Sequence, residues 1–151
     1  MLAMKALQFL AVVLTALALV PGGAHLLAMP NKLGLDGAAY FSVQGIYRGW
    51  ALLGIVPIAA IAADIALAIG VRRQPAPFRL ALAGALCLAA TLAVFFLWTY
   101  PANQATANWT AVPNDWAALR RQWEYSHAAS AILTFVALCL VTLSVLRWRP
   151  G

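Results

Sequence analysis

The sequence predicts an all-α integral membrane protein, in which one domain of residues 1–151 forms a bundle of four transmembrane helices. Of its 151 residues, 64% are hydrophobic and 9% are charged, whereas about a quarter of the residues of a soluble domain are charged. A helix needs roughly 20 apolar residues to cross a bilayer. Four apolar runs meet this need, at about residues 6–28, 50–71, 78–99 and 118–147. We therefore expect a multi-pass protein of the bacterial inner (cytoplasmic) membrane.

The net charge of +6 comes from basic residues that stand at the ends of the apolar runs. Membrane topology explains this placement, so the lipid bilayer is the expected partner and nucleic acid is not. A homo-oligomer is an open alternative. No Gly-rich nucleotide loop or C-x-x-C motif occurs, and Cys87 and Cys139 lie inside apolar runs. We expect both to be buried structural thiols.

The first apolar run follows Lys5 and is interrupted by Pro21-Gly22-Gly23 before it resumes to Ala28. A basic residue followed by an apolar run is also typical of a signal peptide, here with Gly23-Ala24 as the cleavage region. Because the apolar character resumes after the glycines, we favour a first transmembrane helix that is kinked or broken near Pro21.

The second span is expected at Trp50–Val71, after a polar connection of residues 30–47 whose Asp36–Phe41 portion forms a short interfacial helix. Pro57 and Asp64 lie inside this span. A carboxyl group in a membrane is costly and often functional. We expect Asp64 to be structural, either neutral or hydrogen-bonded to a neighbour such as Thr91 or Thr142, with a role in proton-coupled transport as the alternative.

The third span, Phe78–Thr99, follows a basic turn and ends in aromatic residues typical of a membrane interface. Residues 100–114 read as a polar loop. Small residues recur at every fourth position in two spans and predict close helix approach. They are Ala62, Ala66 and Gly70 in the second span, and Ala81, Ala85, Ala89 and Ala93 in the third.

The fourth helix is expected to run from Asp115 to Trp148, with Asn114 or Asp115 as its N-terminal cap. Its length of roughly 50 Å exceeds the hydrocarbon core of about 30 Å. Its first turns therefore extend beyond the membrane on the outer side.

Four spans place both chain termini on one side of the membrane. That side carries six basic residues and no acids, against four basic residues on the other, so the positive-inside rule favours an N-in, C-in orientation. The six are Lys5, Arg72, Arg73, Arg79, Arg147 and Arg149, and the four are Lys32, Arg48, Arg120 and Arg121.

This topology gathers most hydrogen-bonding side chains at the outward half of the bundle. Arg120, Glu124 and His127 follow one another at steps of four and three, so they share one face of the fourth helix. Two histidines near a glutamate suggest proton transfer. The candidate catalytic residues are His127, Asn103 and Arg120, and the candidate substrate-binding residues are His25, Gln44, Tyr47, Trp123 and Glu124.

Two other interpretations of these residues stay open. A metal or haem at His25 and His127 is the minority interpretation, because the paired motifs of metal-binding bundles are absent; no metal site and no cofactor is favoured. In the structural interpretation, Arg120 and Glu124 form an i,i+4 pair, and His127 is a hydrogen-bonded core residue. Trp109, Trp116 and Trp123 then belong to an interfacial belt.

Several stretches together resemble the anthrone-oxygenase-like family of small four-helix membrane proteins. They are Ala24-His25 with Pro30-Asn31-Lys32, Tyr40-x-x-x-Gln44 with Tyr47-Arg48-Gly49-Trp50, Pro101-x-Asn103, and Trp116-x-x-x-Arg120-x-x-Trp123-x-x-x-His127. Family members usually have an arginine where this chain has Ala131.

The resemblance implies oxidation of anthrones to anthraquinones without an established cofactor. His127 would then be a general base, while Asn103, Arg120 and His25 would orient the substrate or stabilise its anion. We therefore consider two functions. The first is a membrane oxidoreductase or oxygenase that acts on a small aromatic or lipophilic substrate at the outward end of the bundle. The second is a non-enzymatic carrier or assembly subunit whose polar cluster is structural.

Overall fold

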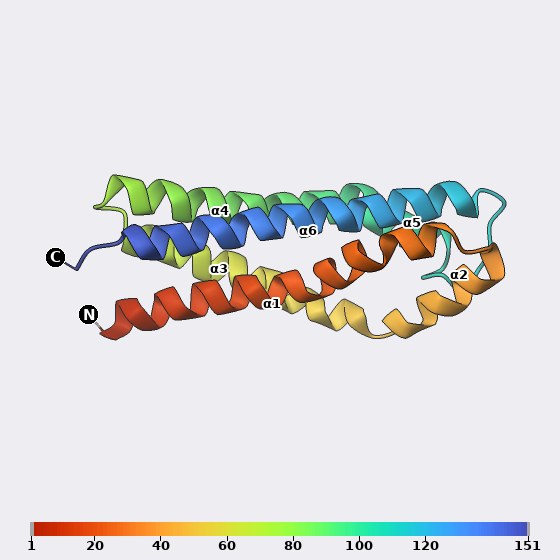
Figure 1. Ribbon diagram of the computed structural model, residues 1–151, viewed down its shortest axis with the longest axis horizontal. Helices are drawn as coiled ribbons and strands as arrows, with labels where there is room; N and C mark the ends of the chain where they lie inside the picture. The colour runs from red at the N-terminus through yellow and green to blue at the C-terminus, as the bar shows by residue number, and fades with distance from the viewer. Residues whose placement is uncertain (1, 151) are drawn as a thin grey trace.

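In the computed structural model, which describes residues 2–150, four long helical segments lie side by side and both termini are at one end (Figure 1). This arrangement confirms the predicted all-α bundle of four helices long and apolar enough to span a membrane. We call the end opposite the termini the distal end. The elements are α1 (Leu2–Leu33), α2 (Gly37–Gln44), η1 (Gly45–Tyr47), η2 (Trp50–Gly54), α3 (Ile55–Gly70), α4 (Pro75–Val94), η3 (Phe95–Thr99), α5 (Tyr100–Ala105) and α6 (Trp116–Arg147).

Helix α1 is longer than the sequence predicts, because it continues through Pro21 and Pro30 to Leu33. It is not broken at Pro21, although its path bends toward α6 in its second half (Figure 1). Packing against α3 and α6 supports the helix where the two prolines each remove a backbone donor. The polar connection therefore starts only after Leu33, and Lys32 stands on the last turn of α1.

The connection to the second span contains the expected short helix, α2. The carboxylate of Asp36 accepts a hydrogen bond of 2.8 Å from the backbone N–H of Ala39, which caps the start of α2. Gly49, with φ of 87°, turns the chain between η1 and η2. The α-helical part of the second span begins only at Ile55, so Pro57 falls in the first turn of α3, where its missing N–H costs little.

The third span extends beyond its predicted end. After α4, a π-helical turn of residues Phe95–Thr99 leads into α5, so the predicted loop of residues 100–114 begins with six helical residues. Pro101 has no N–H to donate to the preceding turn, and the wider π turn is where the helix adjusts to this loss. Asn103 consequently stands on a helix instead of in a loop.

Helix α6 agrees with the prediction to within one residue at each end. Asp115 occupies the N-terminal cap position, but its side chain makes no capping hydrogen bond, so the predicted side-chain cap is wrong.

Only some of the predicted small residues lie at contacts between helices. Gly84 of α4 faces α6, where a Cβ atom would lie 2.7 Å from a methyl carbon of Val141 and 3.3 Å from the carbonyl oxygen of Ala137. Ala81 and Ala85, on either side of Gly84, are buried, whereas Ala89 and Ala93 are exposed. The other predicted stripe, on α3, is exposed at Ala62 and Ala66. Gly70, at its end, lies against α1, since a Cβ atom there would be 2.7 Å from Cε of Met4.

Two further predictions need correction. Cys139 is exposed on the bundle surface and Cys87 is only partly buried, so the thiols are not both core residues. Asp64 is fully buried as a structural carboxyl group would be, but its partner is Thr15 of α1, at 3.3 and 3.4 Å. The Thr91 hydroxyl is already bonded to the carbonyl of Leu88 in its own helix.

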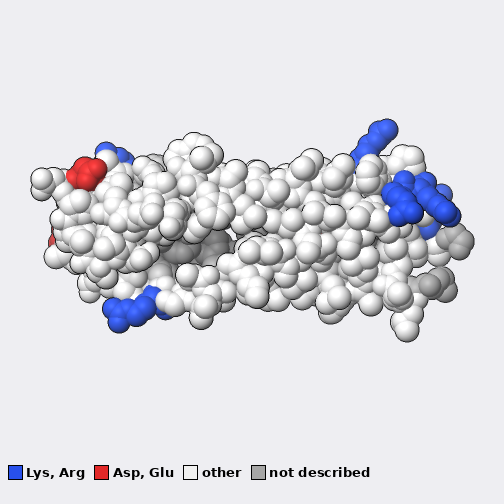
Figure 2. Space-filling model, turned by 180° about the vertical axis from the view of Figure 1, so that it is seen from behind, with Lys and Arg blue, Asp and Glu red and all other residues white. Residues whose placement is uncertain are grey.

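The charged residues lie toward the two ends of the bundle. Figure 2 shows Lys and Arg only near the ends of this face, acidic residues only near the distal end, and a wide uncharged band between them. Large apolar side chains such as Phe9, Leu17 and Phe135 are exposed along that band. A surface of this kind fits lipid instead of water.

We predict that Gly84→Ala destabilises the bundle by about 1–3 kcal/mol, because the added methyl group overpacks the contact between α4 and α6. Gly23→Ala is the matched control, since a Cβ atom at Gly23 meets nothing within 4 Å. Unfolding midpoints of the detergent-solubilised variants measure the difference. Equal midpoints for the two variants would contradict the close approach of α4 and α6.

Candidate functional site

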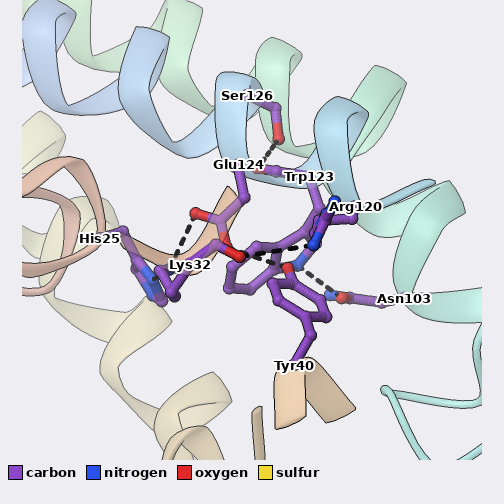
Figure 3. A network of polar contacts seen from close by, with 8 residues as sticks. All are labelled: His25, Lys32, Tyr40, Asn103, Arg120, Trp123, Glu124 and Ser126. Atoms are coloured by element: carbon purple, nitrogen blue, oxygen red, sulfur yellow. Dashed lines mark hydrogen bonds and ion pairs between the residues drawn. The ribbon is translucent and has the colours of Figure 1, made fainter. Parts of the chain in front are cut away.

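A buried ion pair stands at the centre of the distal end. The ammonium of Lys32 on α1 lies 2.8 Å from Oε2 of Glu124 on α6, and the two residues are 3% and 1% exposed. The hydroxyl of Tyr40 on α2 donates a 2.9 Å hydrogen bond to Oε1 of the same carboxylate (Figure 3). Three elements are thus joined at one carboxylate, and both of its oxygens are engaged.

The two histidines adjoin this ion pair. The Lys32 ammonium lies 3.4 Å from Nδ1 of His25. Because an ammonium only donates, Nδ1 accepts and the neutral His25 ring carries its hydrogen on Nε2. The rings of His25 and His127 stack with centroids 4.2 Å apart. Among the described residues, none engages the ring nitrogens of His127 in a hydrogen bond.

Aromatic side chains enclose the histidines and the ammonium. The Trp123 ring lies 4.2 Å from His127 and 4.9 Å from His25, and Tyr47 lies 4.3 Å from His25. The Lys32 ammonium is 5.2 Å from the centroid of Tyr47 and 5.1 Å from that of Trp123. These faces attract the cation while they exclude water from it.

Asn103 positions two indoles. Its side-chain oxygen accepts hydrogen bonds from Nε1 of Trp123, at 2.8 Å, and from Nε1 of Trp109, at 3.2 Å. Both tryptophans are buried, so neither belongs to an interfacial belt. Buried indole N–H groups need acceptors, and this one amide oxygen serves both.

The turn that brings Trp109 to Asn103 has an unusual backbone. Ala107, Asn108 and Trp109 have φ of 48°, 55° and 64°, in the left-handed region that disfavours L residues. The Thr106 hydroxyl supports the turn, since it donates to the carbonyl of Ala102 and accepts from the N–H of Trp109. Strain of this kind persists where surrounding contacts fix it.

The structural interpretation expected Arg120 to pair with Glu124, and this pair does not form. Nη1 of Arg120 donates to the carbonyl oxygen of Leu35 at 2.6 Å, and its guanidinium carbon lies 4.8 Å from the ring centroid of Trp116. The carboxylate of Glu124 is instead taken by Lys32. Arg120 therefore ties α6 to the segment between α1 and α2.

Gln44 is buried near this group, with 5% of its surface exposed. Its amide lies close enough to the Tyr40 hydroxyl to offset part of the rise in the pKa of that group. Neither polar atom of the amide makes a hydrogen bond, however, and the buried Nε of Arg120 makes none either. Buried polar atoms are nearly always paired, so these groups are exceptions.

Two grooves on the bundle surface border this region. One of about 250 Å³ lies between α1 and α6 and is lined by apolar residues that include Gly23, Leu26 and Ala131. Gly23 and Leu26 are neighbours of His25 in sequence, and Ala131 is one turn beyond His127. The other groove, of about 530 Å³, lies between α4 and α6 and includes Trp98 and Arg121.

The structure gathers the predicted site residues at one end, but it adds Lys32 and Tyr40, which the sequence did not single out. Lys32 lies seven residues after His25, a spacing that places both on one helix face once α1 is known to continue through Pro30. Tyr40 lies one turn before Gln44 on α2. Both residues belong to the stretches that carry the family resemblance, and this resemblance is the feature of the sequence that could have identified them.

Within residues 2–150, no group of three or more His, Cys, Asp or Glu side chains is arranged to hold a metal ion. The chain matches no family model, and neither a curated protein nor a solved structure is significantly similar to it.

We predict that Glu124→Gln destabilises the protein by about 3–5 kcal/mol, because it leaves the Lys32 ammonium buried without a counter-charge. The double variant Lys32→Met/Glu124→Gln should recover part of this loss, since it removes the unpaired charge. Unfolding midpoints of the two variants test the pair. A double variant less stable than Glu124→Gln alone would show that the pairing is not what matters.

The hydroxyl of Tyr40 provides a pH test. Burial, and then the nearby carboxylate of Glu124, raise the pKa of Tyr40 far above its usual value of 10.0. The unfolded chain therefore loses this proton first, and the stability that Tyr40 contributes is complete below pH 10.0 and falls as the pH rises above it.

Tyr40→Phe should therefore flatten the alkaline loss of stability. Its phenolate absorbance should also match that of the wild type up to about pH 11. A phenolate signal near pH 10 that disappears in Tyr40→Phe would contradict the burial of this hydroxyl.

Proposed function

We propose that the protein is a membrane-integral oxidoreductase that oxidises a small, lipophilic aromatic substrate with O₂ at the distal end of the bundle. We also propose that this end faces outward from a bacterial inner membrane, since six of the ten basic residues stand at the other end. The observation that carries the proposal is an imidazole without a hydrogen-bond partner among the described residues, His127, which stacks on His25 at the edge of the buried polar group of Lys32, Glu124 and Tyr40.

The chain of contacts suits general base chemistry. His127 takes a proton from an activated C–H or phenolic O–H group of the substrate. His25 stacks against His127 and is hydrogen-bonded to Lys32, so both groups fix the position of the base and the charge that surrounds it. The enclosing rings of Trp123 and Tyr47 exclude water and so strengthen these interactions.

The family resemblance suggests an anthrone as substrate. After deprotonation, the electron-rich carbon reacts with O₂, and the resulting hydroperoxide loses water to give the quinone carbonyl. The substrate methylene supplies all four electrons. One oxygen atom enters the product and the other leaves as water, so the balance needs no further reductant. The apolar groove between α1 and α6 offers a lipophilic substrate an approach from the bilayer.

One observation favours the non-enzymatic alternative. The histidines are closely surrounded by other rings, since His25 alone contacts Tyr47, Trp50, Trp123 and His127. A polar cluster packed in this way suits a purely structural role, in which it fixes the distal ends of the helices of a carrier or assembly subunit.

We predict that the protein in lipid nanodiscs consumes one O₂ per anthrone oxidised, above the rate of empty nanodiscs. His127→Ala should lower this turnover by about 100-fold, as expected for loss of a general base.

Tyr125→Phe is the matched control, because Tyr125 is exposed on the same helix, and its turnover should stay within about twofold of the wild type. Thermal unfolding verifies that each variant is folded. Equal turnover in folded His127→Ala and wild-type protein, or no turnover in either, would favour the structural alternative.

A further inference from the structure

We infer that the distal end binds a ligand that carries one negative charge, such as an aromatic carboxylate or phenolate, at Arg120 and Gln44. This inference deepens the proposed function, because it gives the charge of the ligand that binds at the same end of the bundle. It rests on the proposed function in taking that ligand to be a small aromatic molecule. Two independent observations carry it: an uncompensated positive charge, and two buried polar groups without partners.

The charge balance of the distal end is unequal. Lys32, Arg48, Arg120 and Arg121 bring four positive charges to this end, and Asp36, Asp115 and Glu124 bring three negative charges. Of the three acids only Glu124 is buried, and Lys32 takes its charge. That ion pair is the only one among residues 2–150, so Arg120 has no acidic partner there. Asp36 and Asp115, the other acids of this end, are exposed. One positive charge therefore stands uncompensated in a partly buried place, and a monoanion complements it.

The unpartnered groups add a hydrogen-bonding argument. The side-chain amide of Gln44 is 95% buried and both of its polar atoms lack a partner. Nε of Arg120 is likewise buried and unpaired. Leaving such groups unsatisfied costs free energy. A ligand oxygen that accepts from Nε2 of Gln44 and Nε of Arg120 would satisfy these two nitrogens, whereas Oε1 of Gln44, which only accepts, gains nothing from an anion.

Gln44 and Arg120 both lie next to Tyr40. Gln44 lies one turn after Tyr40 on the same face of α2, and the guanidinium carbon of Arg120 lies 5.4 Å from the Tyr40 ring centroid. The planar guanidinium suits a carboxylate or phenolate oxygen. Arg120 itself is partly exposed, which leaves this side of the cluster accessible.

Aromatic rings next to Arg120 suit an aromatic ligand body. Trp116 lies 4.8 Å from the guanidinium carbon, and Phe41 lies 6.3 Å from Trp116. The site thus combines a fixed positive charge with apolar rings. A neutral ligand would gain only from the rings, and a cationic ligand would be repelled by Arg120.

Three fluorescent probes that share one tricyclic body test the charge preference in nanodiscs of neutral lipid. They are 9-anthracenecarboxylate, 9-anthracenemethanol and 9-(aminomethyl)anthracene, measured at pH 7.5 with empty nanodiscs as the blank. Partitioning into lipid favours the neutral probe. We expect the protein to bind the carboxylate at least about tenfold more tightly than either of the others, as one charge-assisted hydrogen bond provides. Equal or tighter binding of the neutral probe would overturn the inference.

Arg120→Gln should weaken carboxylate binding by about 10–100-fold and remove the preference for the anion. Arg121→Gln is the matched control, because it removes the same charge from the adjacent, exposed position, and its affinity should stay within about threefold of the wild type. Gln44→Leu, which fills the same space without the amide, should weaken binding while the guanidinium stays in place. Equal losses in Arg120→Gln and Arg121→Gln would reduce the effect to a general surface charge and overturn the site.

The binding measurement is separate from the turnover measurement. Anion binding that disappears in Arg120→Gln supports this site even when no O₂ is consumed, in which case the oxidase proposal alone fails. Turnover of a neutral substrate by a protein that shows no preference for the carboxylate would leave the oxidase proposal and overturn this inference.

Discussion

The buried pair of Lys32 and Glu124 is the interaction on which the distal end of the bundle depends. Two charges removed from water are costly unless their hydrogen bonds are satisfied. The remaining carboxylate oxygen is satisfied by Tyr40, and the ammonium is shared with His25 and faced by two aromatic rings. Meeting these requirements fixes α1, α2 and α6 against one another. The same contacts set the tautomer of His25 and its position against His127.

The remainder of the distal end holds this arrangement in place. Asn103 binds the N–H groups of two tryptophans, and one of them, Trp123, forms a wall of the histidine site. Asn103 can do so because the π turn and Pro101 carry α5 into what the sequence presents as a loop. The strained turn at residues 107–109 then returns Trp109 to the core. The contacts that position the two histidines are therefore the same contacts that hold the distal ends of the helices together.

Much of the fold was predictable because hydrophobicity acts locally along the chain. The four spans and the bounds of α6 were identified from runs of apolar residues, and a short helix was expected at Asp36–Phe41. The gathering of His25, His127, Glu124 and Asn103 at one end followed from the number of spans alone. Errors arose where packing overrides a local signal: α1 passes Pro30, α5 extends the third span, and Asp64 binds Thr15 instead of Thr91 or Thr142.

The amino-acid sequence was enough to predict a four-helix membrane protein with its polar residues at one end, since the length of an apolar run and the placement of charges are properties of single segments. Which polar groups meet became known from the packing of the helices against one another. It paired Glu124 with Lys32 instead of Arg120, and it left Nε of Arg120 and the side-chain amide of Gln44 without hydrogen bonds. Such pairings depend on where each helix ends and how it is rotated about its axis, and a shift of one residue turns a helical side chain by about 100°.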